Sequence, residues 1–455
     1  MVGRPGTRAA PLSLHAASPA RVKAMSRAGC AATHAVAGAG RRVMPSRVQK
    51  IGYLIPEFPG QTHIFFWREL QALPGKGVSP ELVSTRPPPA GIISHRWAHE
   101  AMARTEYLMP PGPLGVVKAA AEVARAMPSG WARCLASIAR AEGLDAKGRA
   151  QLLAFAIMGG RLASLARERG WTHVHVHSCA NAAHVALFAH LLSGLTYSLT
   201  LHGPLYDYGP NQREKWRHAQ FAFVITKKLL QEVNDELAGA LPSRIELAPM
   251  GVELRKFNRS VAYAPWTGEG PLRIFSCGRL NPCKGHADLI DAVGLLRAKG
   301  LDARLAIAGE DEAGGTTYRK VLEAKLQETR LGDAVTLLGA VSEDTVRGEI
   351  ERAHIFSLAS LQEPLGVAIM EAMAMRVPVV VTGAGGVPEL VDDGVDGILV
   401  PPQQPQVLAD KLEAVARDAQ EAHRLGEAGR RKVETTFSSE RSADMLALML
   451  QRAVV

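Results

Sequence analysis

From residue 47 onward, short apolar runs alternate with longer stretches in which apolar residues recur every three or four positions. Residues 48–55 form the first apolar run, which predicts a strand. The loop 56–62 follows, and residues 63–73 then predict a helix that glycines at 75 and 77 terminate. A strand, a glycine-containing loop and a helix in that order are typical of an α/β domain whose ligand groups lie at the carboxyl ends of parallel strands.

The alternation continues to about residue 258. Residues 86–116 are rich in proline and predict irregular structure. Residues 117–169 are rich in Ala, Leu and Arg and predict helices. Further strands are predicted at 174–177, 197–201 and 222–226. These elements predict a first α/β domain at 47–258.

A second series of elements follows a break in the pattern. Proline and glycine cluster near 248–252 and 264–271, and we place a linker at 259–270. The elements after it are predicted as strands at 272–276, 303–309, 335–338, 354–358 and 377–382, and helices at 287–299, 318–329, from about Gly366, and from 406 to the end. We therefore predict a second α/β domain at 271–436 and a C-terminal helix at 437–455. Ligands usually bind in the cleft between two such domains.

Composition and charge narrow the classes of protein that remain. A chain of 455 residues with 47% hydrophobic and 21% charged residues is long enough for two domains and is neither disordered nor disulfide-rich. The net charge of +9 suggests nucleic-acid binding, but residues 1–50 hold nine Lys/Arg and no Asp or Glu. The remainder is neutral, so nucleic acid is not an expected partner. It divides into a basic part, 51–260, with net charge +7, and an acidic part, 261–455, with net charge −7.

The first 46 residues are rich in Ala, Arg and Gly and lack the continuous apolar core of a signal peptide. They predict either a disordered basic leader or sequence upstream of the true start. Met44 directly precedes the first strand, and a start there is our preferred interpretation. The N-terminal mass of the mature protein would test it.

The cysteines and the longest uncharged run indicate in which cellular compartment the protein is expected. The five cysteines include no C-x-x-C pair and no metal-ligand spacing, which favours a reducing compartment and neither disulfides nor a zinc site. Residues 171–206 contain no Asp, Glu, Lys or Arg, but their histidines, asparagine and glycines favour a buried strand, helix and strand over a membrane span. We expect a cytoplasmic protein.

The most informative stretch runs from residue 363 to residue 389. Pro364 and Gly366 predict a turn from a strand into a helix, whose first amides are unpaired and suit a phosphate. Glu363 lies in the loop and Glu371 about a turn and a half into the helix. Each carboxylate could accept hydrogen bonds from vicinal sugar hydroxyls. For Glu363 alone, an acidic residue near a helix N-terminus is the simpler interpretation.

The E-x7-E spacing of Glu363 and Glu371, with the glycine-rich turn 383–386 and the pair Pro388-Glu389, resembles the retaining glycosyltransferases of family 4, which have the GT-B fold. The resemblance implies two Rossmann-like domains that face each other across a cleft, with a C-terminal helix returning to the first. It covers most of 47–455, through residues 249–253, 278–285, 308–309 and 394–401. In the first half, residues 58–62, 175–177 and 200–203 resemble exopolysaccharide enzymes of the colanic-acid type.

The resemblance assigns most donor contacts to the second domain. It implies that Arg279 and Lys284 bind the donor diphosphate, and the local chemistry agrees because a guanidinium and an ammonium can neutralise a departing nucleotide diphosphate. Glu371 is expected to hold the ribose hydroxyls and Glu363 the hydroxyls of the transferred sugar.

The remaining site residues also follow from the resemblance. The amides near Gly366 and Val367 are expected to contact sugar or phosphate, and His202 to lie near the reacting centre. Gly60 would let the first-domain loop approach the diphosphate. Histidines 173, 175 and 177 are expected to be structural.

The expected activity is retaining, metal-independent transfer of a hexosyl group from a nucleotide-diphosphate sugar to a glycan or lipid-linked acceptor. No Asp-x-Asp stands at a strand end, and we expect no metal and no cofactor besides the donor. A dehydrogenase is disfavoured because the nearest glycine motif, 383–388, has proline at the third glycine position. A non-catalytic nucleotide-sugar-binding protein and a GT-B-type epimerase remain alternatives.

The basic first half raises a further hypothesis. It would dock on an anionic membrane, on the inner face of the plasma membrane, that carries a lipid-linked acceptor. Lys118, Arg125, Arg133 and Arg140 on the Ala-rich helices are the candidate contacts. A solvated charged surface explains the same residues equally well.

Overall fold

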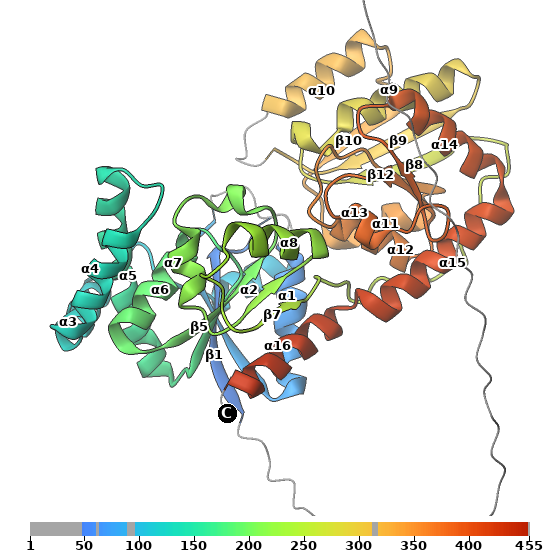
Figure 1. The fold of residues 1–455 in the computed structure, drawn as a ribbon. Coiled ribbons are helices and arrows are strands. Elements are labelled where there is room, and N and C mark those ends of the chain that lie inside the picture. Colours follow the sequence, from blue (N-terminus) through green and yellow to red (C-terminus); the bar gives the residue numbers. More distant parts are fainter. Residues whose placement is uncertain (1–47, 61–62, 89–95, 312–316, 454–455) are drawn as a thin grey trace, which may run out of the picture. The chain divides into compact units, whose positions relative to one another are not determined.

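The computed structural model of the protein describes residues 48–60, 63–88, 96–311 and 317–453. It contains two parallel sheets with helices packed on their faces (Figure 1). This arrangement confirms the predicted α/β class.

The first sheet has the strand order β3-β2-β1-β4-β5-β6-β7, and all neighbouring pairs are parallel. Its strands are β1 (Gln49–Glu57), β2 (Val78–Arg86), β3 (Glu106–Tyr107), β4 (His173–Val176), β5 (Thr196–Leu201), β6 (Ala222–Val224) and β7 (Ile245–Leu247). The helices are α1 (Ile64–Ala72), α2 (Arg96–Arg104), α3 (Pro113–Arg125), α4 (Ser129–Arg140), α5 (Ala146–Arg169), α6 (Asn181–Ser193), α7 (Gln212–Arg217) and α8 (Lys227–Glu236), with 3₁₀ turns η1 (Leu73–Lys76) and η2 (Leu205–Tyr208). Strand order reverses direction between β1 and β4.

The second sheet repeats this topology in the order β10-β9-β8-β11-β12-β13, again parallel throughout. Its strands are β8 (Leu272–Cys277), β9 (Ala303–Ala308), β10 (Val335–Gly339), β11 (Ile355–Leu358), β12 (Val379–Thr382) and β13 (Ile398–Val400). The helices are α9 (His286–Ala298), α10 (Thr317–Glu328), α11 (Glu343–Arg352), α12 (Val367–Ala374), α13 (Val387–Leu390), α14 (Pro405–Arg417), α15 (Ala419–Thr436) and α16 (Ser439–Ala453), with the 3₁₀ turn η3 (Pro282–Lys284). The reversal lies between β8 and β11.

Strand β1 shows how the alternating pattern builds the core. Ile51, Tyr53 and Ile55 are fully buried in one hydrophobic cluster with α1 and α16, whereas Leu54 is buried in another with α5 and α6. Side chains of a strand point alternately to its two faces, so a strand covered on both faces must be apolar at nearly every position.

The chain crosses between the sheets twice, and the two crossing segments pair with each other. Val252 and Ser438 form a parallel bridge, with the amide of Val252 donating to the carbonyl of Phe437 over 2.9 Å. A side chain at Gly251 would place its Cβ 2.1 Å from the carbonyl carbon of Ser438, so only glycine allows this approach. After the second crossing, α16 packs on α1 of the first domain (Figure 1). The predicted return of the C-terminal helix is confirmed.

One prediction for the first domain is wrong. Residues 86–116 were expected to be irregular, but α2 and β3 lie within them, and β2 before them was not predicted. The proline clusters lie outside α2, which buries Ala98 and Ala101 and packs the partly buried Trp97 against the hydrophobic cluster that also holds Ala101. The helix is only nine residues long and stands between proline-rich stretches, so the composition of the segment concealed its periodicity.

The predicted helices at 117–169 are present as α3 to α5, and the uncharged run 171–206 forms β4, α6 and β5. None of the helices that the structure describes combines the length and the apolar composition needed to cross a bilayer.

Candidate active site

A cavity of about 670 Å³ lies where the carboxyl ends of both sheets meet. It is lined by residues at the carboxyl ends of β1 and β4 in the first sheet, such as Glu57 and His177, and of β8 and β11 in the second, such as Gly278 and Leu358. These are the strand pairs at which each sheet reverses its order. Ligands of open α/β sheets bind at such switch points.

Seven of the eight residues predicted for the site line this cavity. They are His202, Arg279, Lys284, Glu363, Gly366, Val367 and Glu371. Gly60 is not among the lining residues, although Glu57 and His63 on either side of it are. Gln61 and Thr62 of the same predicted loop lie outside the described residues. The structure thus brings together the predicted contacts of the second domain and one histidine of the first.

Lys284 and Glu363 contact each other directly. Lys284 Nζ lies 2.5 Å from Glu363 Oε2, and both side chains are largely buried, with 13% and 8% exposure. The hydroxyl of Ser360 donates to the same carboxylate oxygen over 3.2 Å. The amide of Leu361 donates to the carbonyl of Cys283 over 2.7 Å, so the two loops are also joined through their backbones. A cation and an acceptor are thereby held side by side in the cavity wall.

The glycine-rich turn after β12 supports the loop of Glu363. The amide of Gly386 donates to the carbonyl of Glu363 over 2.8 Å. A Cβ at Gly386 would lie 2.0 Å from the carbonyl oxygen of Pro364, so a larger residue would push the two segments apart. The turn therefore fixes the position of the Glu363 backbone at the cavity. This close packing is a structural reason for the glycines noted in the sequence.

Helix α12 begins at the cavity and carries Glu371. Its N-cap, Gly366, has a positive φ of 99°, a conformation that favours glycine. The unpaired amides of the first turn and the positive end of the helix are available to an anion. Glu371, one turn further on, is buried, and Arg68 Nη2 of α1 donates to its Oε1 over 2.7 Å.

Two histidines of the first domain, His63 and His202, line the cavity. Burial, reinforced by the nearby charge of Arg279, lowers the pKa of His63 to about 4. Burial and the neighbouring His177 hold the pKa of His202 well below its usual range. Both rings are therefore neutral near pH 7 and can act as hydrogen-bond partners rather than as cations.

His202 is connected through His177 to the largely buried carboxylate of Glu69. Its Nε2 lies 3.2 Å from His177 Nδ1, and His177 Nε2 lies 3.3 Å from Glu69 Oε1. The hydroxyl of Tyr53 donates to the same Glu69 oxygen over 2.8 Å. Since the carboxylate favours a proton on His177 Nε2, His177 Nδ1 is left to accept from His202 Nε2–H. This chain fixes the orientation of His202 at the cavity wall.

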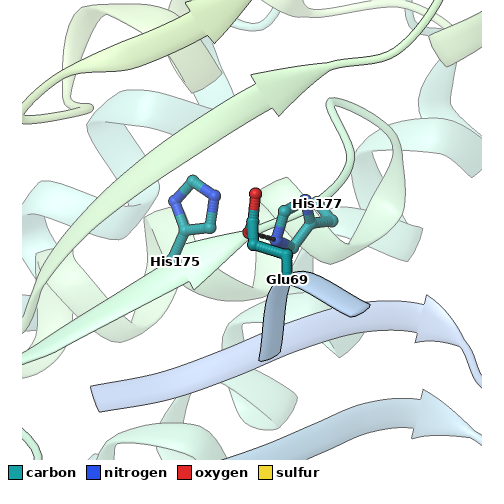
Figure 2. Close-up of side chains that lie close together, drawn as sticks. All are labelled: Glu69, His175 and His177. Carbon is teal, nitrogen blue, oxygen red and sulfur yellow. Dashed lines mark ion pairs between the residues drawn. The ribbon is translucent and has the colours of Figure 1, made fainter. Parts of the chain in front are cut away.

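Figure 2 shows Glu69 of α1 beside His175 of β4 and His177 just after it, with the ion pair between Glu69 and His177 marked. Each can offer a metal-ligand atom, and these atoms lie within 4.8 Å of one another. In the described structure, however, both ring nitrogens of His175 already have hydroxyl partners, Ser198 Oγ at 2.8 Å and Thr200 Oγ1 at 3.0 Å. The group has the composition of a metal site, and its hydrogen bonds fit equally well with a structural role for these histidines.

Sequence reasoning missed several charged residues at or beside the cavity, among them Arg68 and Glu343. Glu343 starts α11, lines the cavity, and accepts from Arg68 Nη2 over 2.6 Å. Neither lies in a motif, and their pairing joins residues 275 positions apart. The available signal was weak: Arg68 shares a helix face with the apolar Ile64, Phe65 and Ala72, which is unusual for a solvated charge.

Part of the chain matches a known family model. Residues 266–432 match the family described as glycosyl transferases group 1. All the site residues predicted in the second domain, from Arg279 to Glu371, lie within this matched range.

Relatives with similar sequences include a putative colanic acid biosynthesis glycosyltransferase, WcaL, of Salmonella typhimurium and the amylovoran biosynthesis glycosyltransferase AmsK of Erwinia amylovora. The first is 31% identical over 49% of this chain and 56% of its own length. The second is 32% identical over 47% of this chain and 52% of its own length. The aligned part thus spans about half the length of these relatives.

Among solved structures, Alr3699/HepE of Anabaena in complex with UDP and glucose superposes with a TM-score of 0.66 at 18% identity, over 89% of this chain and 99% of that one. Sucrose-phosphate synthase of Thermosynechococcus elongatus superposes with a TM-score of 0.65 at 19% identity, over 89% and 98%. At this identity the likeness concerns the fold. The predicted GT-B fold is confirmed.

Proposed function

We propose that the protein is a retaining, metal-independent glycosyltransferase that moves a hexosyl group from a nucleotide-diphosphate sugar to a glycan or lipid-linked acceptor in exopolysaccharide biosynthesis. One observation carries this proposal: Arg279, Lys284, Glu363 and Glu371 line a single cavity at the switch points of two parallel sheets. Relatives that are named for colanic acid and amylovoran biosynthesis support the pathway class.

The donor would bind with its diphosphate near the start of α12. Arg279, Lys284 and the first amides of that helix then neutralise the charge that grows on the departing diphosphate. Glu371 accepts from the ribose hydroxyls and Glu363 from hydroxyls of the transferred sugar. Solved neighbours bound to UDP and glucose, together with the family resemblance, make UDP-hexose and GDP-mannose the donors to test first.

Retention follows if donor and acceptor react on the same face of the sugar. The acceptor oxygen forms the new bond to the anomeric carbon as the bond to the diphosphate breaks, and the departing phosphate oxygen takes the acceptor proton. His202 Nδ1, which has no hydrogen-bond partner in the described structure, can accept a hydrogen bond from a sugar or acceptor hydroxyl. The chain from Glu69 through His177 keeps that nitrogen unprotonated.

We also propose that the first domain contacts an anionic membrane that presents the acceptor, on the inner face of the plasma membrane. Helices α3 to α5 expose large apolar side chains, with exposures from 40% to 65%: Leu114, Val116, Val117, Leu135, Leu153 and Ile157. The cations predicted for this contact have partners, since Lys118, Arg125 and Arg140 pair with glutamates and Arg133 Nε donates to a backbone carbonyl. The exposed apolar side chains therefore support the contact better than the four cations do.

The test is a panel of nucleotide sugars incubated with the purified protein and lipid or glycan acceptors, with the released nucleotide and the product anomer identified. A retained anomer formed in the presence of a chelator is the expected result. Nucleotide binding without turnover across the panel would favour a binding protein, and conversion of the sugar without transfer would favour an epimerase.

A further inference from the structure

Arg68 of α1 joins the two domains directly behind the nucleotide end of the cavity. Its side chain is 1% exposed, and its Nη2 donates to Glu343 over 2.6 Å and to Glu371 over 2.7 Å. Lys256 Nζ lies 2.5 Å from the other oxygen of Glu343. The two carboxylates line the cavity, whereas Arg68 does not. The guanidinium therefore contacts the cavity only through the carboxylates that it holds.

The charges of this group are balanced but unevenly placed. Two cations face two anions, yet Lys256 reaches only Glu343, so Arg68 is the cation paired with Glu371. The guanidinium also lies 4.8 Å from the centroid of the Phe257 ring. Because a buried charge that loses its partner is strongly disfavoured, Glu371 depends on Arg68 to stay ionised.

The direction of the electrostatic effect on Glu371 supports this dependence. Burial raises the pKa of Glu371, and the charge and hydrogen bond of Arg68 act in the opposite direction. If Arg68 were absent, burial would act without that opposing contribution, and the carboxyl would bind a proton at a higher pH. A protonated carboxyl is a poorer acceptor for two ribose hydroxyls than a carboxylate.

We infer that Arg68 is a positioning residue for the nucleotide: it occupies Oε1 of Glu371, keeps the carboxylate ionised, and leaves Oε2 to accept from the ribose. Through Glu343 it also ties α1 to α11, so the nucleotide end of the second domain is completed by a residue of the first. This inference rests on the proposed function, because it takes the ligand of Glu371 to be a ribose.

The experiment measures the affinity of the full chain for UDP, GDP and ADP by calorimetry from pH 7 to pH 9, above the range in which phosphate and histidine ordinarily titrate. For the wild type we expect an affinity for the preferred nucleotide that hardly changes with pH. For Arg68→Met we expect weaker binding that recovers as pH rises, by up to about tenfold per pH unit below the new pKa of Glu371. For Arg68→Lys, which keeps the charge, we expect the flat profile to return.

The control is Arg161→Met, which removes a largely buried arginine of the same domain. Arg161 Nη2 lies 3.1 Å from Glu106 Oε1, and neither residue lines the cavity. This variant should lower stability without changing nucleotide affinity.

If Arg68→Met binds with the wild-type affinity and pH profile, or if its loss of affinity is independent of pH and persists in Arg68→Lys, the inference is wrong. Should Arg68→Met fail to fold, Arg68→Lys and Glu343→Gln decide: both keep a cation at residue 68, and a pH-dependent loss in either contradicts the inference. If the wild type binds none of the three nucleotides, the proposed function and the inference both fall.

Discussion

Lys284 and Glu363 form an ion pair in the wall of the cavity, with Nζ and Oε2 2.5 Å apart. The family resemblance gives these residues separate ligands, a diphosphate for the lysine and a sugar for the glutamate. Their contact means that each also orients the other before a donor arrives. A donor phosphate would compete with Glu363 for the ammonium, which releases Glu363 toward the sugar hydroxyls.

We predict that Lys284→Ala and Glu371→Ala each lower transfer by about 100-fold or more, because each removes a charged contact from the reacting or nucleotide end of the donor. Folding should persist, since Arg68 keeps Glu343 as a partner when Glu371 is removed, and Glu363 keeps the hydroxyl of Ser360 when Lys284 is removed. Turnover with the preferred donor and thermal unfolding are the measurements. Full activity in either variant would sink the assignment of the site.

The fold could be predicted further than the site. Strands such as β1 and β12 carry continuous apolar runs because both faces of their sheets are covered, and such runs are visible in one sequence. The contacts of Arg68 are not visible, since pairing across 303 residues depends on how α1 and α12 meet in space. The motif residues Arg279 to Glu371 were predicted from the family resemblance. The structure then showed the ion pairs of Lys284, Glu363 and Glu371.

Glu389 gives a second interdomain contact that can be tested. Its carboxylate accepts from the amides of Lys227 and Lys228, over 2.6 and 2.9 Å, at the N-terminus of α8. Loss of such a cap costs about 1 kcal/mol of unfolding free energy. We predict that loss for Glu389→Ala, measured by urea unfolding, together with weaker nucleotide binding because the residue follows the turn that supports Glu363.

The matched control for Glu389 is Asp145→Ala, which removes the carboxylate cap that accepts from the amide of Gly148 at the start of α5. It should cost a similar free energy of unfolding and leave nucleotide affinity unchanged. If Glu389→Ala changes nucleotide affinity no more than Asp145→Ala does, the contact of Glu389 is only a helix cap.

Stability should fall as the solution becomes acidic. Burial lowers the pKa of both His173 and His184 to about 3. A histidine with an ordinary pKa of 6.5 in the unfolded chain then binds a proton more readily than the folded one, so its stabilising contribution is full above pH 6.5 and is lost toward pH 3. Each such residue can contribute up to about 1.4 kcal/mol per pH unit in that window.

The measurement is urea unfolding at pH 7.5, 6.5 and 5.5 for the wild type and for His184→Gln, whose side chain can keep a contact with Asn211. The wild type should lose stability as pH falls, and the variant should lose less per pH unit because one titrating group is gone. Constant or rising stability toward pH 5.5 would contradict the burial of neutral histidines.

Two measurements test whether the protein uses a metal ion. We expect transfer to continue at the same rate in EDTA, because Arg279, Lys284 and the start of α12 supply the positive charge that a metal would otherwise bring. Metal analysis of the purified protein addresses the group of Glu69, His175 and His177 separately. Stoichiometric metal that is lost in Glu69→Ala would assign a metal site there, and loss of transfer in EDTA would overturn metal independence.

Membrane contact can be separated into its apolar and its electrostatic parts. Leu114 and Val117 are 65% and 64% exposed on one face of α3, whereas the neighbouring Lys118 already pairs with Glu168 over 2.7 Å. Since apolar side chains gain free energy when they leave water, the double variant Leu114→Ser, Val117→Ser should bind anionic vesicles at low salt about tenfold more weakly than the wild type. Lys118→Gln should change binding little, because its charge is already balanced. If the wild type does not float with the vesicles, or if only the lysine variant is impaired, the apolar contact is wrong, and the proposed transfer reaction stands without it.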